Sequence, residues 1–569
     1  MMFVWGDKSF ARACVTGCRL IASVLWLFVP FCAYGMQPSR PTIWFDALAP
    51  DHGVRGVLDW DSLFHANPAW DQVAGEIQVY TLSPGYVLFA TDNNLKALAE
   101  NLRTHHIALA MPIQSIAIMP GEACGHEEGY EQPALAARAA EKLHRLGITP
   151  QFLTLDGPLW TGHFTSGAQG CHLAIPELVR RIKLVVGEFQ RFFPNVRFGE
   201  ADGPVGILTM PSWREDFEQY YRLFRSVIGR PIEYEFMDVN WPIPSWPSDL
   251  KTLAEFYRSQ GVKFGVIYGG GYRATDDVHW VSGMIQNIDM FETVEGIVPD
   301  NVDFESWTSQ PSHVLPQDSD ASLSHLLAHY LLPRTKLLVA RAGRVIQGQL
   351  IDEQGHPVAG APVRVTELGD DPRQAPPIRV ITGTVPQHAQ FGMMVLRVNM
   401  DCWCSGPNNV MVGPFTYRES GDEDTHVYSF LNDAEKRKGP RPDHVVPEPV
   451  SIGGKEFVRF TVPAGQPFGF NSRPFPVTPG ATFVVTAPIA SLDGQGMFGS
   501  AAVIWTGTGS LGRPHVLVPA DVTPLGTATT DAQGHFSFAI PAPAGGPGIR
   551  LRVMFNGTAT LRGAGADLP

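Results

Sequence analysis

Short hydrophobic runs alternate with longer amphipathic segments along the first half of the chain. The run 152–155, inside QFLTLDGPLW, is apolar and β-branched and has the length of one buried parallel strand. Segment 94–103 instead places Leu95, Leu98 and Leu102 at helical spacing, so one of its faces is apolar. The alternation of these two periods predicts a series of strand-then-helix units.

These units recur often enough to close a barrel. The predicted strands are 43–46, 77–82, 107–111, 152–155, 196–200, 232–238, 262–268 and 302–305. The predicted helices are 94–103, 133–146, 175–193, 213–228, 250–260, 275–294 and 322–332. About eight units over about 300 residues match a TIM barrel, and the first strand lacks the glycine-rich loop of a doubly wound nucleotide-binding sheet. We therefore expect a (β/α)8 TIM barrel over 37–340.

Beyond residue 344 the hydrophobic period shortens to two, and glycine and proline turns separate the runs. Runs near 345–365 and near 530–555 have the alternation of one small sandwich, and many short β-like runs lie between them. We expect a multidomain protein in which all-β sandwich domains follow the barrel. The expected domains are a discontinuous β-sandwich from 344–377 and 522–569 and a jelly-roll β-sandwich inserted at 378–521.

Two motifs suggest what these sandwiches resemble. Residues 348–361 (GQLIDEQGHPVAGA) and 530–536 (TDAQGHF) resemble the two halves of the carboxypeptidase-regulatory, prealbumin-like module. The insert, with its short strands and turns, resembles the jelly rolls of carbohydrate-binding modules. The first resemblance implies a fold and no catalytic role.

The N-terminal residues have the pattern of an export signal. Basic residues precede the apolar run 20–32, and Ala33-Tyr34-Gly35 is a small-x-small cleavage site. The run is shorter than the about 20 residues that a membrane-spanning helix needs. We expect a signal peptide over 1–35, a secreted or periplasmic protein, and no stable membrane insertion after cleavage.

Composition and charge narrow the range of partners. The 569 residues are 44% hydrophobic and 17% charged, which are globular values with ample core material. The formal net charge of −13 argues against a polyanionic partner such as nucleic acid. A neutral ligand fits this charge better.

Three of the seven cysteines lie in the segment that we expect to be removed. Cys124 and Cys171 follow neighbouring predicted strands, and in an oxidising compartment we expect them to form a disulfide. Cys402 and Cys404 are too close for an easy internal bond and have no His or Cys partner pair nearby. We expect no metal site there.

In a TIM barrel the functional residues lie at the carboxyl-terminal ends of the strands. Acidic residues occupy several of those ends, and two suitably spaced carboxylates can cleave a glycosidic bond. The candidate catalytic residues are Asp156, Glu305, Glu200 and Asp238. Asp156 and Glu305 end the clearest apolar strands and are the favoured pair. The alternative for each acid is a structural role at the barrel rim.

Aromatic and polar side chains near the same strand ends complete a predicted sugar site, because aromatic faces stack on pyranose rings and carboxylates hold hydroxyl groups. The candidate substrate-binding residues are Asp46, Tyr80, Trp160, His163, Trp241, Tyr268 and Trp307. Ordinary packing is the alternative for the aromatic residues, and a surface position is the alternative for His163. No H-E-x-x-H, P-loop or G-x-S-x-G motif is present, so we expect neither a metal nor another cofactor.

The segments LDGPLW (155–160), DVNW (238–241) and FESW (304–307) resemble those of secreted bacterial (β/α)8 proteins of the glycoside-hydrolase type. The resemblance covers about 41–332 and implies an acid/base and a nucleophile on separate strands. In that group a glutamate is expected near Asp156 on strand four, and a carboxylate is expected at the end of strand seven. Here Gly157 follows Asp156, and strand seven ends in VIYG (266–269) without a carboxylate.

Two functions are consistent with these two differences from the glycoside-hydrolase pattern. The first is an exported glycoside hydrolase-like protein that cleaves a poly- or oligosaccharide with a differently placed carboxylate pair. The alternative is a non-catalytic glycan-binding or exopolysaccharide-associated protein whose barrel site is degenerate.

Overall fold

A computed structural model of the chain describes most of the residues from Arg40 onward. The described residues are 40–50, 56–125, 128–165, 170–203, 207–208, 210–239, 241, 246–269, 276–294, 296–306, 310–368, 375–376, 378–387, 389–398, 408–420, 425–429, 445, 447–462, 468–492, 499–506, 515–517, 522–542 and 550–568. The chain divides into two units, Met1–Pro41 and Thr42–Pro569. The predicted signal peptide 1–35 lies outside the described residues.

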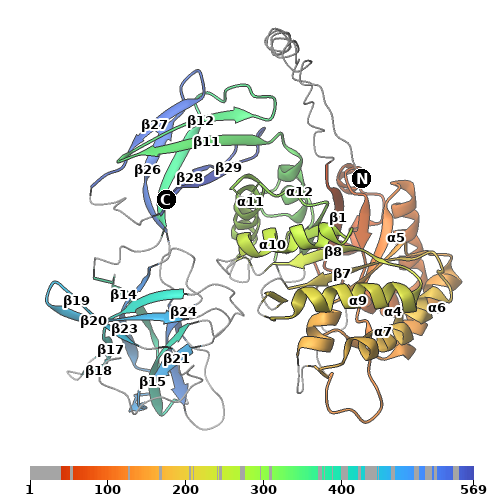
Figure 1. Cartoon of the computed structure of the whole chain (residues 1–569), viewed down its shortest axis with the longest axis horizontal. Coiled ribbons are helices and arrows are strands. Elements are labelled where there is room, and N and C mark those ends of the chain that lie inside the picture. Colours follow the sequence, from red (N-terminus) through yellow and green to blue (C-terminus); the bar gives the residue numbers. More distant parts are fainter. Residues whose placement is uncertain are drawn as a thin grey trace, which may run out of the picture. The chain divides into compact units, whose positions relative to one another are not determined.

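Among the described residues, eight parallel strands close into a barrel (Figure 1). They are β1 (Thr42–Ala47), β2 (Val79–Thr81), β3 (Ala108–Ile113), β6 (Phe152–Asp156), β7 (Arg197–Asp202), β8 (Ile232–Asp238), β9 (Lys263–Ile267) and β10 (Asn301–Ser306). The ring closes where β1 pairs in parallel with β10 on one side and with β2 on the other. The predicted (β/α)8 TIM barrel is confirmed.

Helices lie between and after the barrel strands. They are α2 (Trp60–Leu63), α3 (Pro68–Ala74), α4 (Pro84–Phe89), α5 (Asp92–Thr104), α6 (Pro133–Leu146), α7 (Ile175–Gln190), α9 (Trp213–Ile228), α10 (Trp246–Ser259), α11 (Asp277–Val294) and α12 (Leu323–Leu331). In α6 the locked backbone of Pro133 begins the helix, and Ala136, Ala140 and Leu143 form its buried face. Gly147, with φ of 72°, ends α6 in the left-handed conformation that glycine adopts without a Cβ clash.

The elements agree closely with those expected from the periodicity, and β8, α6 and α9 have the predicted bounds. Three features were not predicted. They are the short helices α2 to α4, the parallel pair β4 (Ile116–Ala117) with β5 (Tyr130–Glu131), and the π-helical turn η1 (Trp160–Phe164) after β6. All are too short for a periodic pattern to reveal them.

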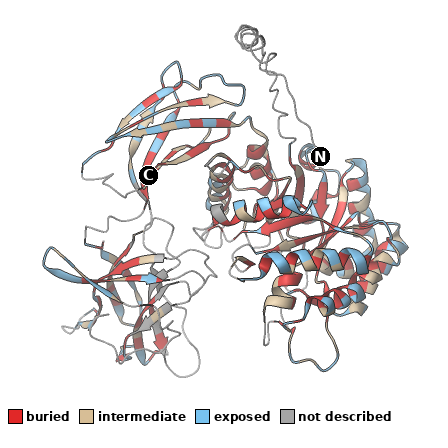
Figure 2. Cartoon of the chain, viewed as in Figure 1, coloured by how far each residue is buried: buried red, intermediate tan, exposed pale blue. Residues whose placement is uncertain are grey.

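Two sets of buried hydrophobic side chains form an inner and an outer layer of the barrel wall. The barrel strands are accordingly coloured mostly as buried in Figure 2. Inside the barrel, the ring centroid of Trp44 lies 4.9 Å from the ring centroid of Tyr234 and 5.1 Å from the ring centroid of Phe236. Outside, residues such as Phe198 and Phe304 pack in the larger core shared with the helices. Because alternate strand residues point to opposite faces, parity along each strand decides whether a side chain faces the interior or the helices.

A β-sandwich combines two segments that are far apart in sequence. Its sheets have the orders β11-β12-β27 and β26-β13-β28-β29. The strands are β11 (Thr335–Ala342), β12 (Val345–Asp352), β13 (Pro362–Leu368), β26 (Val522–Thr529), β27 (His535–Ala539), β28 (Arg550–Phe555) and β29 (Ala564–Leu568). Ile346, Val363 and Val553 belong to its core. Because β11 pairs with β12 along its whole length, the sandwich begins before residue 344, within the range expected for the barrel.

The insert contains two further antiparallel sheets. The larger sheet contains β14 (Ile378–Thr384), β16 (Asn408–Val412), β17 (Phe415–Glu419), β18 (His426–Tyr428), β19 (Glu448–Ile452), β20 (Lys455–Val462) and β23 (Thr482–Ser491). The smaller contains β15 (Phe391–Val398), β21 (Phe468–Asn471), β22 (Phe475–Pro476), β24 (Gly499–Thr506) and β25 (His515–Leu517). Both sheets contribute to one core, with Leu396 and Trp505 from one and Phe460 and Val485 from the other. The expected all-β region is confirmed; Cys402 and Cys404 lie outside the described residues.

Within the described part of the chain, no helix combines the length and the hydrophobicity required to cross a membrane.

Candidate active site

Carboxylates at inward-facing positions of four strands enter the carboxyl-terminal end of the barrel interior. They are Asp46 on β1, Asp156 on β6, Asp238 on β8, and Asp303 with Glu305 on β10. A further acid, Asp202 at the end of β7, also lines the cavity. Asp46 lies two positions after Trp44, and Asp238 lies two positions after Phe236, so each acid shares the interior face with an aromatic ring below it. The parity that fills the barrel with aromatic rings therefore also brings these acids together.

The five inward-facing acids line a cavity of about 510 Å³. Its wall also contains Glu128, Trp160 and Trp241, together with the hydroxyls of Thr81, Thr154 and Thr161. Among the described residues of this wall there is no lysine, arginine or histidine. The volume lies in the range of about 300–1,000 Å³ typical of ligand pockets. The charge favours a neutral or cationic ligand over an anionic one.

The Asp156 carboxyl is buried beside other acidic groups. Burial raises its pKa to about 8, and the neighbouring charges of Glu128 and Asp238 act in the same direction. Gln114 Nε2 donates a hydrogen bond of 2.8 Å to Asp156 Oδ2, which acts in the opposite direction and orients the carboxyl group. At neutral pH Asp156 is therefore mostly protonated.

Asp238 differs from Asp156 in its protonation. Desolvation, followed by the charge of Glu128, raises the pKa of Asp238 to about 6, so this carboxyl is mostly ionised at pH 7. Neighbouring carboxyl groups with separated pKa values can serve as acid and base at one pH.

Glu305, Asp46 and Asp303 form the most repulsive part of the site. Burial is the main cause that raises the pKa of each of them. The second cause is the negative charge of a neighbouring acid. Asp46 acts on Glu305, Asp303 acts on Asp46, and Glu305 acts on Asp303. Asp303 is only 5% exposed, and its Oδ1 has no hydrogen-bond partner among the described residues. This corner of the cavity can offer protonated and unprotonated oxygens to ligand hydroxyl groups.

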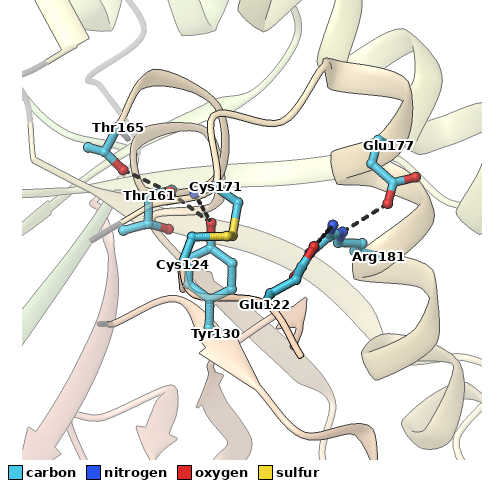
Figure 3. The surroundings of a disulfide bond; sticks show 8 residues. All are labelled: Glu122, Cys124, Tyr130, Thr161, Thr165, Cys171, Glu177 and Arg181. Atoms are coloured by element: carbon cyan, nitrogen blue, oxygen red, sulfur yellow. Dashed lines mark hydrogen bonds and ion pairs between the residues drawn. A yellow bond between two sulfur atoms is a disulfide. The ribbon is translucent and has the colours of Figure 1, made fainter. Parts of the chain in front are cut away.

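The loop after β3 is covalently fixed to the segment after η1 (Figure 3). Cys124 and Cys171 form the predicted disulfide. The Tyr130 hydroxyl beside them accepts a hydrogen bond of 2.9 Å from the Cys171 amide and donates one of 3.1 Å to the Thr161 carbonyl. Glu128 reaches the cavity from this loop, so the disulfide restrains one of its acidic groups.

An ion pair strengthens the same connection. Arg181 of α7 donates two hydrogen bonds of 2.6 Å to the carboxylate of Glu122, which lies two residues before Cys124, and one of 2.9 Å to Glu177 (Figure 3). The Arg181 side chain is buried, so this pair is shielded from solvent screening.

Four predicted site residues do not line the cavity: Glu200, Tyr80, His163 and Tyr268. Tyr80 packs against Phe64 in the helix-facing core, with ring centroids 5.3 Å apart, and the Tyr268 hydroxyl donates to Glu292 of α11 at 2.9 Å. His163 Nδ1 lies 2.6 Å from the Leu173 carbonyl oxygen. Tyr80, Tyr268 and His163 therefore lie outside the cavity wall and have partners of their own.

The structure places the other predicted residues as follows. Asp46, Trp160 and Trp241 line the cavity. The Trp241 indole N–H has no acceptor among the described residues and is available for a ligand hydroxyl. Trp307 lies outside the described residues.

Glu200 belongs instead to a buried group of acids on the helix-facing side of the wall. Glu200 of β7 is the register partner of Glu235 of β8, and Asp202 follows two positions along β7. Tyr220 and Tyr221 of α9 donate to Glu200 and Glu235 respectively. Asp202 alone of the three also lines the cavity.

Two residues of the cavity wall, Asp303 and Glu128, were not among the predicted site residues. Asp303 had a usable signal, since it lies two positions before Glu305 and must share its face. Glu128 had none, because it lies on a loop that the disulfide brings to the cavity.

A comparison with protein-family models finds no match to this chain. A comparison with curated proteins finds no match either. Solved structures with a similar barrel include a GH10 endoxylanase retrieved from a sugarcane soil metagenome, at 10% identity over 50% of this chain and 90% of the xylanase, with a TM-score of 0.32. An endo-1,4-beta-xylanase from Caldicellulosiruptor owensensis is 10% identical over 50% of this chain and 89% of its own, with a TM-score of 0.29.

A 2,3-dimethylmalate lyase of the PEP mutase/isocitrate lyase superfamily is also similar, at 12% identity over 40% of this chain and 66% of the lyase, with a TM-score of 0.23. Hydrolases and a lyase therefore appear together, and likenesses this weak carry no argument about activity. The fold and the site define a (β/α)8 barrel protein with an acidic cavity, and its chemistry has to be argued from that cavity.

Proposed function

We propose that this chain is an exported glycoside-hydrolase-like protein that cleaves a poly- or oligosaccharide in the acidic cavity of its barrel. The observation that supports the proposal is the group of five carboxylates at the strand ends beside Trp160 and Trp241. Hydrolysis of a glycosidic bond needs one protonated and one ionised carboxyl group, and aromatic and hydroxyl groups can position the sugar.

In this proposal Asp156 protonates the leaving oxygen, because its pKa of about 8 keeps the proton at neutral pH and Gln114 orients the group. Two residues compete for the role of the second carboxylate. Glu305 is the choice from the sequence, and Asp238, with a pKa of about 6, is the acid that is mostly ionised before substrate binds. The substrate is a neutral or positively charged glycan, since the described wall carries acidic groups and no basic group.

The proposal extends to the location of the protein and to its β-sandwiches. The Cys124–Cys171 disulfide supports an oxidising compartment, secreted or periplasmic, in agreement with the leader pattern of 1–35. The inserted sandwich would bind carbohydrate as a jelly-roll module, and the discontinuous sandwich would be a prealbumin-like spacer. N-terminal sequencing of the exported protein tests the leader, and a mature chain that retains residues 1–35 contradicts it.

The catalytic roles can be separated with two kinds of substrate. A panel of neutral and amino-sugar polysaccharides first identifies one from which the wild type releases new reducing ends. Asp156→Asn should then lower turnover of that polysaccharide by about 10²–10⁴-fold. It should affect an aryl glycoside with a good leaving group far less, because that group departs without a proton.

The second carboxylate is the residue whose amide variant, Glu305→Gln or Asp238→Asn, loses both substrates. Glu255→Gln, on the exposed face of α10, is the matched control and should behave as wild type. Full activity of Asp156→Asn, or of both Glu305→Gln and Asp238→Asn, would sink the proposal.

A non-catalytic glycan-binding role is favoured by one observation. Gly269, after β9, lines the cavity at the strand-seven position where the hydrolases that the sequence resembles carry a carboxylate. Retention of one polysaccharide on the immobilised protein, with no reducing ends released over days, would support this second function and exclude the first.

A further inference from the structure

The acids Glu200, Asp202 and Glu235 lie outside the proposed chemistry and have an unusual environment. Their exposed fractions are 0%, 3% and 0%. They lie between β7, β8 and α9, and among the described residues none of them forms an ion pair with a lysine, arginine or histidine. Three carboxyl groups in an apolar layer without a cation are costly to bury as anions.

Their oxygens fall into two sets. Tyr220 donates to Glu200 Oε1, and Tyr221 donates to Glu235 Oε2 at 3.0 Å. The other four oxygens, Glu200 Oε2, both oxygens of Asp202 and Glu235 Oε1, have no hydrogen-bond donor among the described residues. The two tyrosines of α9 thus hold the carboxyl groups of Glu200 and Glu235 in place. Four carboxyl oxygens of the three acids are left without a hydrogen-bond donor in the described part of the chain.

The oxygens of the three residues also have the spacing of a cation's ligands. One oxygen from each acid lies within 4.8 Å of one from each of the other two. Oxygen ligands of Ca²⁺ lie about 2.3–2.6 Å from the ion, so two ligands on opposite sides of it are about 4.6–5.2 Å apart. The set is compact enough to surround one ion.

A proton shared between two of the acids explains these oxygens without donors less well than a bound cation does. A proton between Glu200 and Glu235 satisfies one oxygen of each residue and leaves both oxygens of Asp202 without a donor. The Tyr257 hydroxyl of α10 is also buried and has no partner among the described residues. A single cation would be shared by one oxygen of each of the three acids, Asp202 included.

We propose that Glu200, Asp202 and Glu235 form a binding site for one hard divalent cation, Ca²⁺ in the first instance. The ligands are carboxylate oxygens alone, which suits Ca²⁺ or Mg²⁺ and not a metal that prefers nitrogen or sulfur. No metal was expected from the sequence, because it carries no H-E-x-x-H motif. This proposal does not depend on whether the barrel cleaves a glycan.

The proposed site adjoins the cavity. Asp202 belongs to the three acids and also lines the cavity wall. Gly157, which follows Asp156, has φ of 46°, and a Cβ there would lie 3.2 Å from Asp202 Oδ1. The bound ion would therefore hold the turn after β6 in place behind Asp156.

The test uses the full chain freed of metal with a chelator. Titration with Ca²⁺ should show about one bound equivalent, and millimolar Ca²⁺ should raise the Tm by several degrees, because an ion that binds only the folded state stabilises it. Glu235→Gln should weaken Ca²⁺ binding at least tenfold and abolish the Tm shift. Its Tm without Ca²⁺ should equal or exceed that of wild type, which shows that the variant folds.

Two controls separate this site from the acidic cavity and from the surface. Glu305→Gln changes a cavity acid and should keep the bound equivalent, and the exposed Glu255→Gln should match wild type in every measurement. The proposal is overturned if neither Ca²⁺ nor Mg²⁺ binds or shifts the wild-type Tm. It is also overturned if Glu235→Gln binds as tightly as wild type, or if Glu305→Gln loses the equivalent.

Discussion

Two groups of buried carboxylates in this protein are compensated in different ways. Asp289 and Glu292 of α11 receive the guanidinium of Arg562, whose Nε lies 3.1 Å from Asp289 Oδ1 and whose Nη1 lies 2.9 Å from Glu292 Oε2. All three side chains are at most 2% exposed. Glu200, Asp202 and Glu235 are as deeply buried, yet the described residues offer them tyrosine hydroxyls and no cation.

The first group also has its remaining oxygens satisfied. The Gly563 amide donates to Asp289 Oδ2 at 2.9 Å, and the hydroxyls of Tyr268 and Tyr330 each donate to Glu292 Oε1 at 2.9 Å. The comparison teaches that burial alone does not define a functional acid. What distinguishes the two groups is whether the chain itself supplies the positive charge.

The largest loss of stability should come from removing the positive charge of Arg562. Arg562→Met removes the buried guanidinium that Asp289 and Glu292 share, and among the described residues it leaves them only His329 and the partly exposed Arg334 as ion-pair partners. It should lower the free energy of unfolding by about 3 kcal/mol. Urea denaturation of the purified chain measures the change. As a control, Arg103→Met breaks an exposed pair with Glu100 and should leave the free energy of unfolding nearly unchanged. An Arg562→Met protein as stable as wild type would mean that the two groups do not differ as described.

The second prediction is a change in the free energy of unfolding that has opposite signs in the two groups of buried acids. In metal-free protein, Glu235→Gln should raise the free energy of unfolding by about 1–3 kcal/mol, because a neutral amide relieves repulsion and can donate to oxygens that lack a donor. Glu292→Gln removes a partner of Arg562 and should lower the free energy of unfolding by a similar amount. Measuring both variants by denaturation tests the comparison directly, and a loss of stability in both would contradict it.

The smallest effect, taken per pH unit, is a pH dependence of the stability of the metal-free protein. Burial raises the pKa of Glu200 to about 8 from an ordinary value of 4.5, so the folded state holds a proton that the unfolded state has already lost. This contribution to stability is complete below about pH 4.5 and is lost as the pH rises toward about 8, at no more than about 1.4 kcal/mol per pH unit for one proton. Glu235→Gln should reduce the slope, since one of the coupled acids is gone, and an unchanged slope would assign the pH dependence elsewhere.

The order and type of the barrel elements could be predicted because they depend on local periodicity. In segment 232–238, which is β8, successive side chains alternate between two buried faces of the sheet. Segment 133–146, which is α6, has a proline at its start and a glycine after its end. The π-helical turn η1 and the early start of the discontinuous sandwich at β11 were not predicted. In each of these the deciding interactions lie outside the segment itself.

The sequence by itself determined that acids would gather at the ends of the barrel strands, because the strand period and the acidic residues that end the runs are both local features. Only the tertiary structure decided which acids face one another. Asp156 and Glu305 point inward and Glu200 points toward the helices, because closure of the barrel assigns each strand parity to one side of the wall. The partnership of Arg562 with Asp289, 273 residues apart, likewise depended on folding, since no local pattern links such distant charges.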